Sequence, residues 1–202
     1  MAPANYQMSK DGIEMQFASN HIGHFLLTNL LVPEIKKGNG VVANVASGGY
    51  QIADPDFEDV NFNDGKAYSP WVAYGRSEGA NILFTVALAK PFIGFGCAAF
   101  SVNPGYVEGT PLQKNSSITP DDMLAGFKIA TERDVAANEI TPRSVEQGAA
   151  TIILSVLDEN LREYSRAYLD YCQLGEAKEY VMKVETAEAL WMLSESLVGE
   201  KF

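Results

Sequence analysis

The chain has 202 residues, of which 47% are hydrophobic and 20% charged, and its net charge is -11 at pH 7. These values are typical of a globular protein with one well-buried domain over residues 1–202, and the acidic charge argues against nucleic acid or an anionic membrane as a partner. The sequence has no apolar run that could span a bilayer and no signal-peptide pattern, so we expect a cytoplasmic protein.

The first part of the chain predicts an extended lead-in, a helix, a strand and a loop. Residues 1–8 carry no periodicity. Ser9 is a candidate N-cap for a helix from about Ile13 to about Lys36. The apolar positions of this helix predict a buried stripe formed by Phe17, Phe25, Leu26, Leu30 and Leu31. The β-branched run 41–46 predicts a strand, and a polar loop follows from 47 to about 70.

Helices and strands alternate through the rest of the chain. Their predicted ranges are a helix around Tyr74 that runs to about Lys90, a strand at 97–102, a helix that starts at Thr119-Pro120, a helix opened by Thr141-Pro142 that ends near Leu157, a strand at 167–172 and a final helix at about 183–198. This alternation predicts an α/β fold with a parallel sheet of about three strands and helices on both faces. Cys97 and Cys172 lie in the two later strands, which favours buried thiols over a disulfide.

Two predicted elements bring polar side chains to one place. Ser47 follows the strand 41–46 in a small-residue loop, where open α/β sheets place their ligands. Tyr74 and Glu78 lie one helical turn apart, so they share a face of their helix. This arrangement resembles the short-chain dehydrogenase/reductase family, and its retinol-dehydrogenase-like members in particular. The motifs that match in order are Asn20-His21-Ile22-Gly23-His24-Phe25, Tyr74-Gly75-Arg76-Ser77, Ala80-Asn81 and Asn103-Pro104-Gly105.

The resemblance implies a truncated Rossmann-like three-layer fold. In the family, an N-terminal half with a glycine-rich turn holds the dinucleotide, and no such fingerprint follows an N-terminal strand here. Without that half, the strand 41–46 becomes an exposed sheet edge, which residues 1–8 or a partner subunit would have to cover. Because the Ile13 and Tyr74 helices form the usual dimer face of the family, we expect a homodimer or homo-oligomer.

The resemblance also implies roles for four polar residues. Tyr74 corresponds to the family's proton donor and acceptor, Ser47 to the serine that hydrogen-bonds the substrate oxygen, and Asn20 to the asparagine that holds a water in the proton relay. Glu78 replaces the lysine that binds the nicotinamide ribose and lowers the tyrosine pKa. An ionised Glu78 would instead raise the pKa of Tyr74, whereas in a dry site the pKa of Glu78 itself would rise toward that of a useful acid or base. The alternative is a solvated glutamate, with Lys66 or Arg133 as a possible ion-pair partner.

Candidate substrate contacts come from small and aromatic residues near these positions, and they suit a small apolar molecule: Gly48, Tyr50, Trp71, Tyr106 and Phe127. Asn103, Pro104 and Gly105 match the family loop that touches the nicotinamide, although Glu108-Gly109 displaces the threonine that usually follows to Thr110. We therefore expect no bound cofactor and treat this loop as vestigial. His21 and His24 are expected to be packing residues, and no metal site is expected.

Three functions remain open. The first is a non-redox enzyme that uses Tyr74, Ser47, Asn20 and Glu78 for proton transfer, such as isomerisation, dehydration or cyclisation in secondary metabolism. The second is a pseudoenzyme that acts as a binding or regulatory module through its sheet edge. The third is an oxidoreductase that uses NADP or NAD and needs a partner subunit for the cofactor half.

Overall fold

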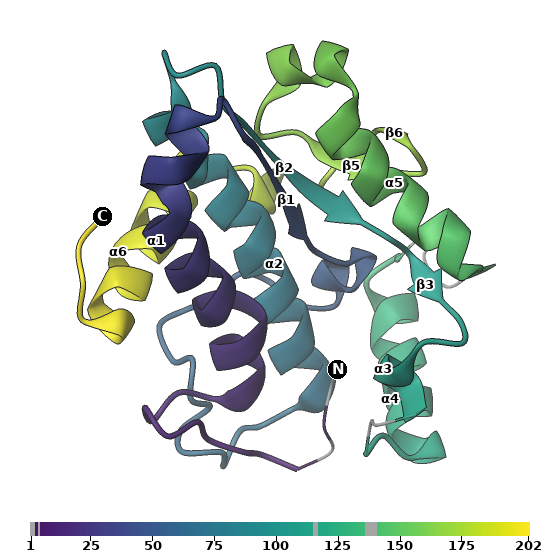
Figure 1. Ribbon diagram of the computed structural model, residues 1–202. Helices are drawn as coiled ribbons and strands as arrows, with labels where there is room; N and C mark the ends of the chain where they lie inside the picture. Colours follow the sequence, from purple (N-terminus) through teal and green to yellow (C-terminus); the bar gives the residue numbers. More distant parts are fainter. Residues whose placement is uncertain (1–2, 4, 115–116, 136–140) are drawn as a thin grey trace.

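The protein is represented by a computed structural model that describes residues 3, 5–114, 117–135 and 141–202 (Figure 1). Its α-helices are α1 (Gly23–Lys37), α2 (Pro70–Leu88), α3 (Pro111–Lys114), α4 (Pro120–Glu132), α5 (Val145–Leu157) and α6 (Val184–Val198). Its strands are β1 (Val41–Val45), β2 (Ala98–Asn103), β3 (Tyr106–Val107), β4 (Pro142–Arg143), β5 (Tyr168–Asp170) and β6 (Gln173–Leu174). A π-helix, η1 (Phe17–Ile22), precedes α1, and three short 3₁₀ helices used below are η2 (Gly48–Ile52), η3 (Lys90–Phe92) and η5 (Glu159–Tyr164).

The main sheet has the strand order β1-β2-β5-β6. β1 and β5 both pair in parallel with β2, in the register Val45 to Val102 to Leu169, which confirms the α/β fold and the three predicted parallel strands. The short antiparallel strand β6 was not predicted. It exists because Tyr171 and Cys172 adopt positive φ angles of 50° and 58°, which turn the chain after Asp170. Cys172 is consequently exposed, so the prediction of a buried thiol there is wrong.

Helices cover both faces of the sheet, as Figure 1 shows. The alternation of side chains along β2 explains how. Phe100 and Val102 point to one face, where Ile152 of α5 packs against their cluster. Ala99 points to the other face and joins Phe25 and Phe84, which come from α1 and α2. Because all six residues of β2 are buried, this strand reads as a continuous apolar run in the sequence.

The first helix begins later than predicted. Glu14 is fully buried, and its two carboxylate oxygens accept hydrogen bonds from the backbone N–H groups of Gln16 (2.9 Å) and Phe17 (2.8 Å). It therefore satisfies the free donors of the first helical turn, a role that the sequence assigned to Ser9. The Ser9 hydroxyl instead accepts from the backbone of Asp11 and Ile13 in the preceding turn.

The predicted buried stripe of this helix is only partly correct. Phe17 and Phe25 are buried, and the Phe25 ring lies 5.3 Å from that of Phe84. Leu30 and Leu31, however, are 57% and 47% exposed. Together with Leu27 they form an outward apolar face on α1, because the aromatic cluster between α1, α2 and α6 takes only one side of the helix.

β1 forms an edge of the sheet, since β2 is its one strand partner among the described residues. The described part of the lead-in does not cover this edge, contrary to one of the two expectations. The Tyr6 ring packs against Tyr68, the Pro3 carbonyl accepts a hydrogen bond from the Tyr68 hydroxyl, and Met8 bridges to Glu14. Within the described ranges, no helix has the length and apolar character needed to cross a bilayer.

Candidate active site

A cavity of about 600 Å³ opens at the carboxyl ends of β1 and β2. Ser47 and the glycines after it border the cavity from the end of β1, and the loop Asn103-Pro104-Gly105 borders it from the end of β2. Tyr74 and Trp71 of α2 form a third side. This is the crevice outside the strand ends where open α/β sheets bind their ligands. Four of the five predicted substrate contacts line it: Gly48, Trp71, Tyr106 and Phe127.

Close approach of Tyr74 to the loop after β1 depends on small residues. Ser47 has an extended backbone and its hydroxyl accepts a hydrogen bond from the Gly49 N–H (3.1 Å), which starts η2. At Gly49 a Cβ atom would come within 2.6 Å of the Tyr74 ring. At Gly75 a Cβ atom would meet the backbone of Ala53 at 3.0 Å. Glycines 49 and 75 thus let α2 and the loop pack closely enough to bring Tyr74 to Ser47.

The Tyr74 phenol is held in its neutral form. Burial raises its pKa above the ordinary value, the nearby Glu78 carboxyl raises it further, and a hydrogen bond with the Ser47 side chain lowers it in part. The net direction is upward. A phenol with a raised pKa can donate a hydrogen bond or a proton, but it is a poor base at neutral pH.

Glu78 is buried behind the cavity and does not line it. It is 8% exposed, and burial raises its pKa to about 8, against a hydrogen bond with Asn81 that lowers the pKa. The solvated alternative is therefore wrong. Neither expected partner pairs with it, because Arg133 binds Asp54 and none of the ion pairs in the described part of the chain includes Glu78 or Lys66.

Asn20 also lies outside the cavity lining. Its side-chain N–H donates to the Ser77 hydroxyl (2.9 Å), and that hydroxyl donates to the backbone carbonyl of Tyr74 (2.8 Å). Asn20 is thus connected to Tyr74 through the backbone of α2. His21 is fully buried against Ser194, and burial lowers its pKa to about 3. His24 contacts Asn44.

Tyr50 is not at the cavity. It is 2% exposed, its hydroxyl accepts a hydrogen bond from the Lys178 backbone N–H (2.9 Å), and its ring packs between Tyr168 and Tyr180. The sequence placed it in the substrate site because it is an aromatic residue close to Ser47 in the chain. In the 3₁₀ turn of η2, however, residue 50 points into the core while residue 49 faces α2.

Sequence reasoning identified Phe127 but missed most of the apolar wall to which it belongs. The missed residues come from η2, α3, α4, α5 and the segment after α4: Ile52, Leu112, Met123, Ala130, Val135, Val145 and Ile152. The Trp71 indole fixes this wall by donating a hydrogen bond to the Asp122 carbonyl (2.6 Å), and its ring lies so close to Gly126 that a Cβ there would be 2.5 Å away. Gly126 inside a capped helix was the available signal, because a glycine there permits close packing.

The described residues do not complete a dinucleotide site. The loop Asn103-Pro104-Gly105 and Thr110 do line the cavity, and Gly105 adopts a φ of +75° beneath the Arg143 guanidinium. At the position that corresponds to the ribose-binding lysine of the family it resembles, however, the chain has the buried carboxyl of Glu78. These residues fit a wall beside a nicotinamide, and none of the described residues that line the cavity carries a charge. In the described ranges, no three His, Cys, Asp or Glu side chains are placed to hold a metal ion.

Known proteins resemble this chain over nearly its whole length. Retinol dehydrogenase 12 of Mus musculus is 34% identical over 197 residues, which are 96% of this chain and 57% of that protein. The chloroplastic short-chain dehydrogenase TIC 32 A of Brassica napus is 32% identical over 202 residues, 96% of this chain and 59% of that protein. A crystal structure of an uncharacterized Mycobacterium paratuberculosis protein has a TM-score of 0.67 and 28% identity, covering 100% of this chain and 65% of that one. No family model matches the chain.

Proposed function

The chain belongs to the short-chain dehydrogenase/reductase family, and on that basis we propose that its cavity is the carbonyl site of an NAD(P)-dependent oxidoreductase that acts on a small apolar aldehyde or ketone. The observation that carries this proposal is the pairing of the Ser47 hydroxyl with the Tyr74 phenol at a cavity whose other walls are mainly apolar. Both groups can donate hydrogen bonds to one carbonyl oxygen. Two of the similar proteins reported above, those of Mus musculus and Brassica napus, are dehydrogenases by name, which supports redox chemistry over the other candidates.

The walls support an apolar substrate. The cavity volume of about 600 Å³ lies within the range of small-molecule sites, roughly 300–1,000 Å³. Trp71, Met123, Phe127 and Ile152 would surround the carbon skeleton, while the polar side chains of the lining come from Ser47, Tyr74, Asn103 and Thr110. An apolar wall excludes water from the carbonyl, which strengthens hydrogen bonds from Ser47 and Tyr74.

The raised pKa of Tyr74 gives the reaction a preferred direction. A neutral phenol can protonate the oxygen of a carbonyl as it becomes an alcohol, but it cannot readily take a proton from an alcohol. We therefore expect carbonyl reduction to be faster than alcohol oxidation at neutral pH. The nicotinamide would supply the hydride when bound. Because the described residues do not complete its site, we expect residues outside this chain to bind most of the dinucleotide.

A second candidate is proton transfer without redox chemistry, as in isomerisation, dehydration or cyclisation. The observation that favours it is Glu78, a buried carboxyl one turn from Tyr74 whose pKa of about 8 suits an acid or base at neutral pH. Since Glu78 does not line the cavity, its proton would have to reach the substrate through Tyr74.

Calorimetric titration of the chain with NADPH and NADH, alongside Glu78→Lys, separates the two candidates. If the redox proposal holds, Glu78→Lys binds a dinucleotide more tightly than the original chain, because it restores a cation at the ribose position. Aldehyde reduction is then measured together with a partner subunit that supplies the remaining cofactor-binding residues. We expect Tyr74→Phe to abolish this activity. The matched control Tyr164→Phe, on the exposed surface of η5, retains it. Proton exchange or isomerisation of a ketone that needs Tyr74 and no dinucleotide would favour the second candidate.

We also propose that the chain forms a homodimer through α1. Leu27, Leu30 and Leu31 are exposed side by side on this helix, at 61%, 57% and 47%. Their outward face is apolar in a chain that is otherwise acidic, and burial against a second copy would remove it from water.

A further inference from the structure

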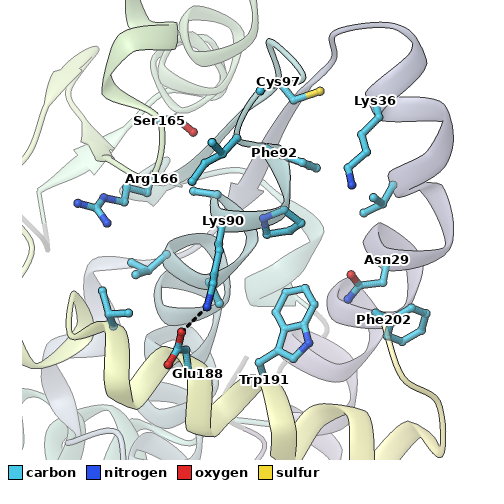
Figure 2. Close-up of a pocket in the computed structure, with 18 of the residues that line it drawn as sticks. Asn29, Lys36, Lys90, Phe92, Cys97, Ser165, Arg166, Glu188, Trp191 and Phe202 are labelled. Atoms are coloured by element: carbon cyan, nitrogen blue, oxygen red, sulfur yellow. Dashed lines mark hydrogen bonds and ion pairs between the residues drawn. The ribbon is translucent and has the colours of Figure 1, made fainter.

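A second cavity lies on another part of the molecule. It has a volume of about 1240 Å³ and is bordered by α1, η3 with its flanking residues, α6 and the turn before β5 (Figure 2). It shares no lining residue with the candidate active site. Neither the resemblance of the chain to known dehydrogenases nor the proposed carbonyl chemistry gives this cavity a role.

The floor of the second cavity is apolar and firmly packed. Phe92 is 2% exposed and belongs to the same core cluster as Phe25 and Phe84. The Trp191 ring contacts this cluster edge-on, with its centroid 5.1 Å from that of Phe25. Met192 is 60% exposed beside it, on the wall that α6 provides. A hydrocarbon chain laid along this floor would gain contact area without displacing the core.

The charge of the second cavity is opposite to that of the chain. The whole chain has 15 Lys and Arg against 26 Asp and Glu. Among the described residues that line this cavity, three are cationic (Lys36, Lys90 and Arg166) and one is acidic (Glu188). Lys90 pairs with Glu188 at 2.8 Å, as the dashed line in Figure 2 shows, so that pair is neutral. Lys36 and Arg166 remain as two cationic side chains that no acidic side chain of the lining neutralises.

Lys36 is the better placed of these two cations. It lies on α1 one further turn along the stripe that begins with Asn29 and Val32, so its side chain borders the same cavity wall. Its ammonium sits 4.4 Å from the centroid of the Phe95 ring. Its neighbour Lys37 instead pairs with Glu34 and does not line the cavity. In the described part of the chain, no carboxylate forms an ion pair with Lys36 or Arg166.

We propose that this cavity binds an amphipathic carboxylate, a molecule with one anionic head and an unbranched hydrocarbon chain. The head contacts the Lys36 ammonium, with Arg166 adding positive potential from the opposite side of the cavity in Figure 2. The hydrocarbon chain lies over Phe92, Trp191 and Met192. A neutral apolar ligand would leave the cations without a partner, and a cationic one would be repelled. The charge of the lining therefore selects the anion.

Tryptophan fluorescence tests this proposal directly, because the chain has two tryptophans and each lines a different cavity. In Trp71→Phe, Trp191 is the one reporter. Titration with monomeric dodecanoate should then change the emission with saturation. Dodecyltrimethylammonium, which has the same hydrocarbon length and the opposite charge, should bind about tenfold more weakly or worse. The same dodecanoate titration of Trp191→Phe, which reports on the other cavity, should show no saturable change.

Charge variants separate a specific head-group contact from general attraction. In the Trp71→Phe background, Lys36→Glu should weaken dodecanoate binding by about tenfold or more, and Lys36→Met should weaken it while keeping most of the apolar stem. Lys37→Glu makes the same charge change one residue away and should leave binding within about twofold. The proposal would be overturned if Lys36→Glu and Lys37→Glu lost dodecanoate affinity equally. It would also be overturned if dodecanoate and dodecyltrimethylammonium bound with equal affinity. The proposal would also be overturned if sedimentation showed that the chain forms a dimer and the dimer did not bind dodecanoate.

Discussion

The Tyr74 ring lies directly against Gly49: a Cβ atom at residue 49 would come within 2.6 Å of the ring atom Cε1. Ser47 is held by the same turn, since its hydroxyl accepts the Gly49 N–H. The position of the phenol relative to the serine therefore depends on the absence of a side chain between them.

Gly49→Ala should displace the Tyr74 ring and separate the two proposed carbonyl-binding groups. Tyr74 belongs to the packed helix α2, so a methyl group 2.6 Å from its ring would force the ring to move away. We expect at least a tenfold loss in affinity for an apolar aldehyde, measured by calorimetry, with a modest loss in thermal stability. Gly23→Ala is the matched control, because its added methyl group meets only an ordinary contact at 3.6 Å in α1 and should stabilise the helix by about 0.5–1 kcal/mol.

Glu78→Gln should change how stability depends on pH. The folded-state pKa of Glu78 is about 8, above its ordinary value of 4.5. Below pH 4.5 the carboxyl is protonated in both the folded and unfolded states. Between these values the unfolded state loses the proton first, so the free energy of unfolding falls as pH rises, and above pH 8 the loss is complete.

Urea unfolding at a series of pH values measures this effect. The free energy of unfolding of Glu78→Gln, minus that of the original chain, should increase by a few kcal/mol as pH rises from 4.5 to 8. Glu58→Gln makes the same chemical change at an exposed position and serves as the control. A flat difference for Glu78→Gln would mean that Glu78 is ionised in the folded protein.

Trp71→Phe should loosen α4, which contributes Met123 and Phe127 to the apolar wall of the candidate site. The substitution removes the hydrogen bond from the indole N–H to the Asp122 carbonyl and part of the ring surface that packs on Gly126. We expect a loss of about 1 kcal/mol in the free energy of unfolding. Hydrogen exchange should become faster in the amides of α4 and remain unchanged in β2. Equal protection of α4 in both proteins would show that other contacts hold it.

The double substitution Leu27→Glu with Leu30→Glu should produce a monomer, because it places charges at the centre of the proposed α1 interface. Sedimentation velocity would measure the change. Leu157→Glu is the matched control, since Leu157 is 71% exposed at the end of α5, a helix that covers the opposite face of the sheet. A monomer in the original chain, or a dimer that survives the double substitution, would contradict the proposal.

The sequence by itself determined the order and type of the main elements. The strands predicted at 41–46 and 97–102 lie within one residue of β1 and β2, and the capping signal at Thr119-Pro120 marks the start of α4. The final helix was expected at 183–198 and α6 spans Val184–Val198. These features depend on local chemistry: β-branched runs, side chains that cap the first turn and prolines at the first helical position. Family motifs further linked Ser47 with Tyr74.

Only the tertiary structure decided which way individual side chains face. Glu14 caps a helix from a buried position, Tyr50 points into the core, and Leu30 and Leu31 face outward. Glu78 is buried but separate from the cavity, which no local pattern distinguishes from a glutamate that lines it. Both cavities arise where elements distant in sequence meet, α2 with α4 and α5 in one case and α1 with α6 in the other. Helical periodicity identifies the apolar face of each element, but the packing of that face against its neighbours decides what remains open.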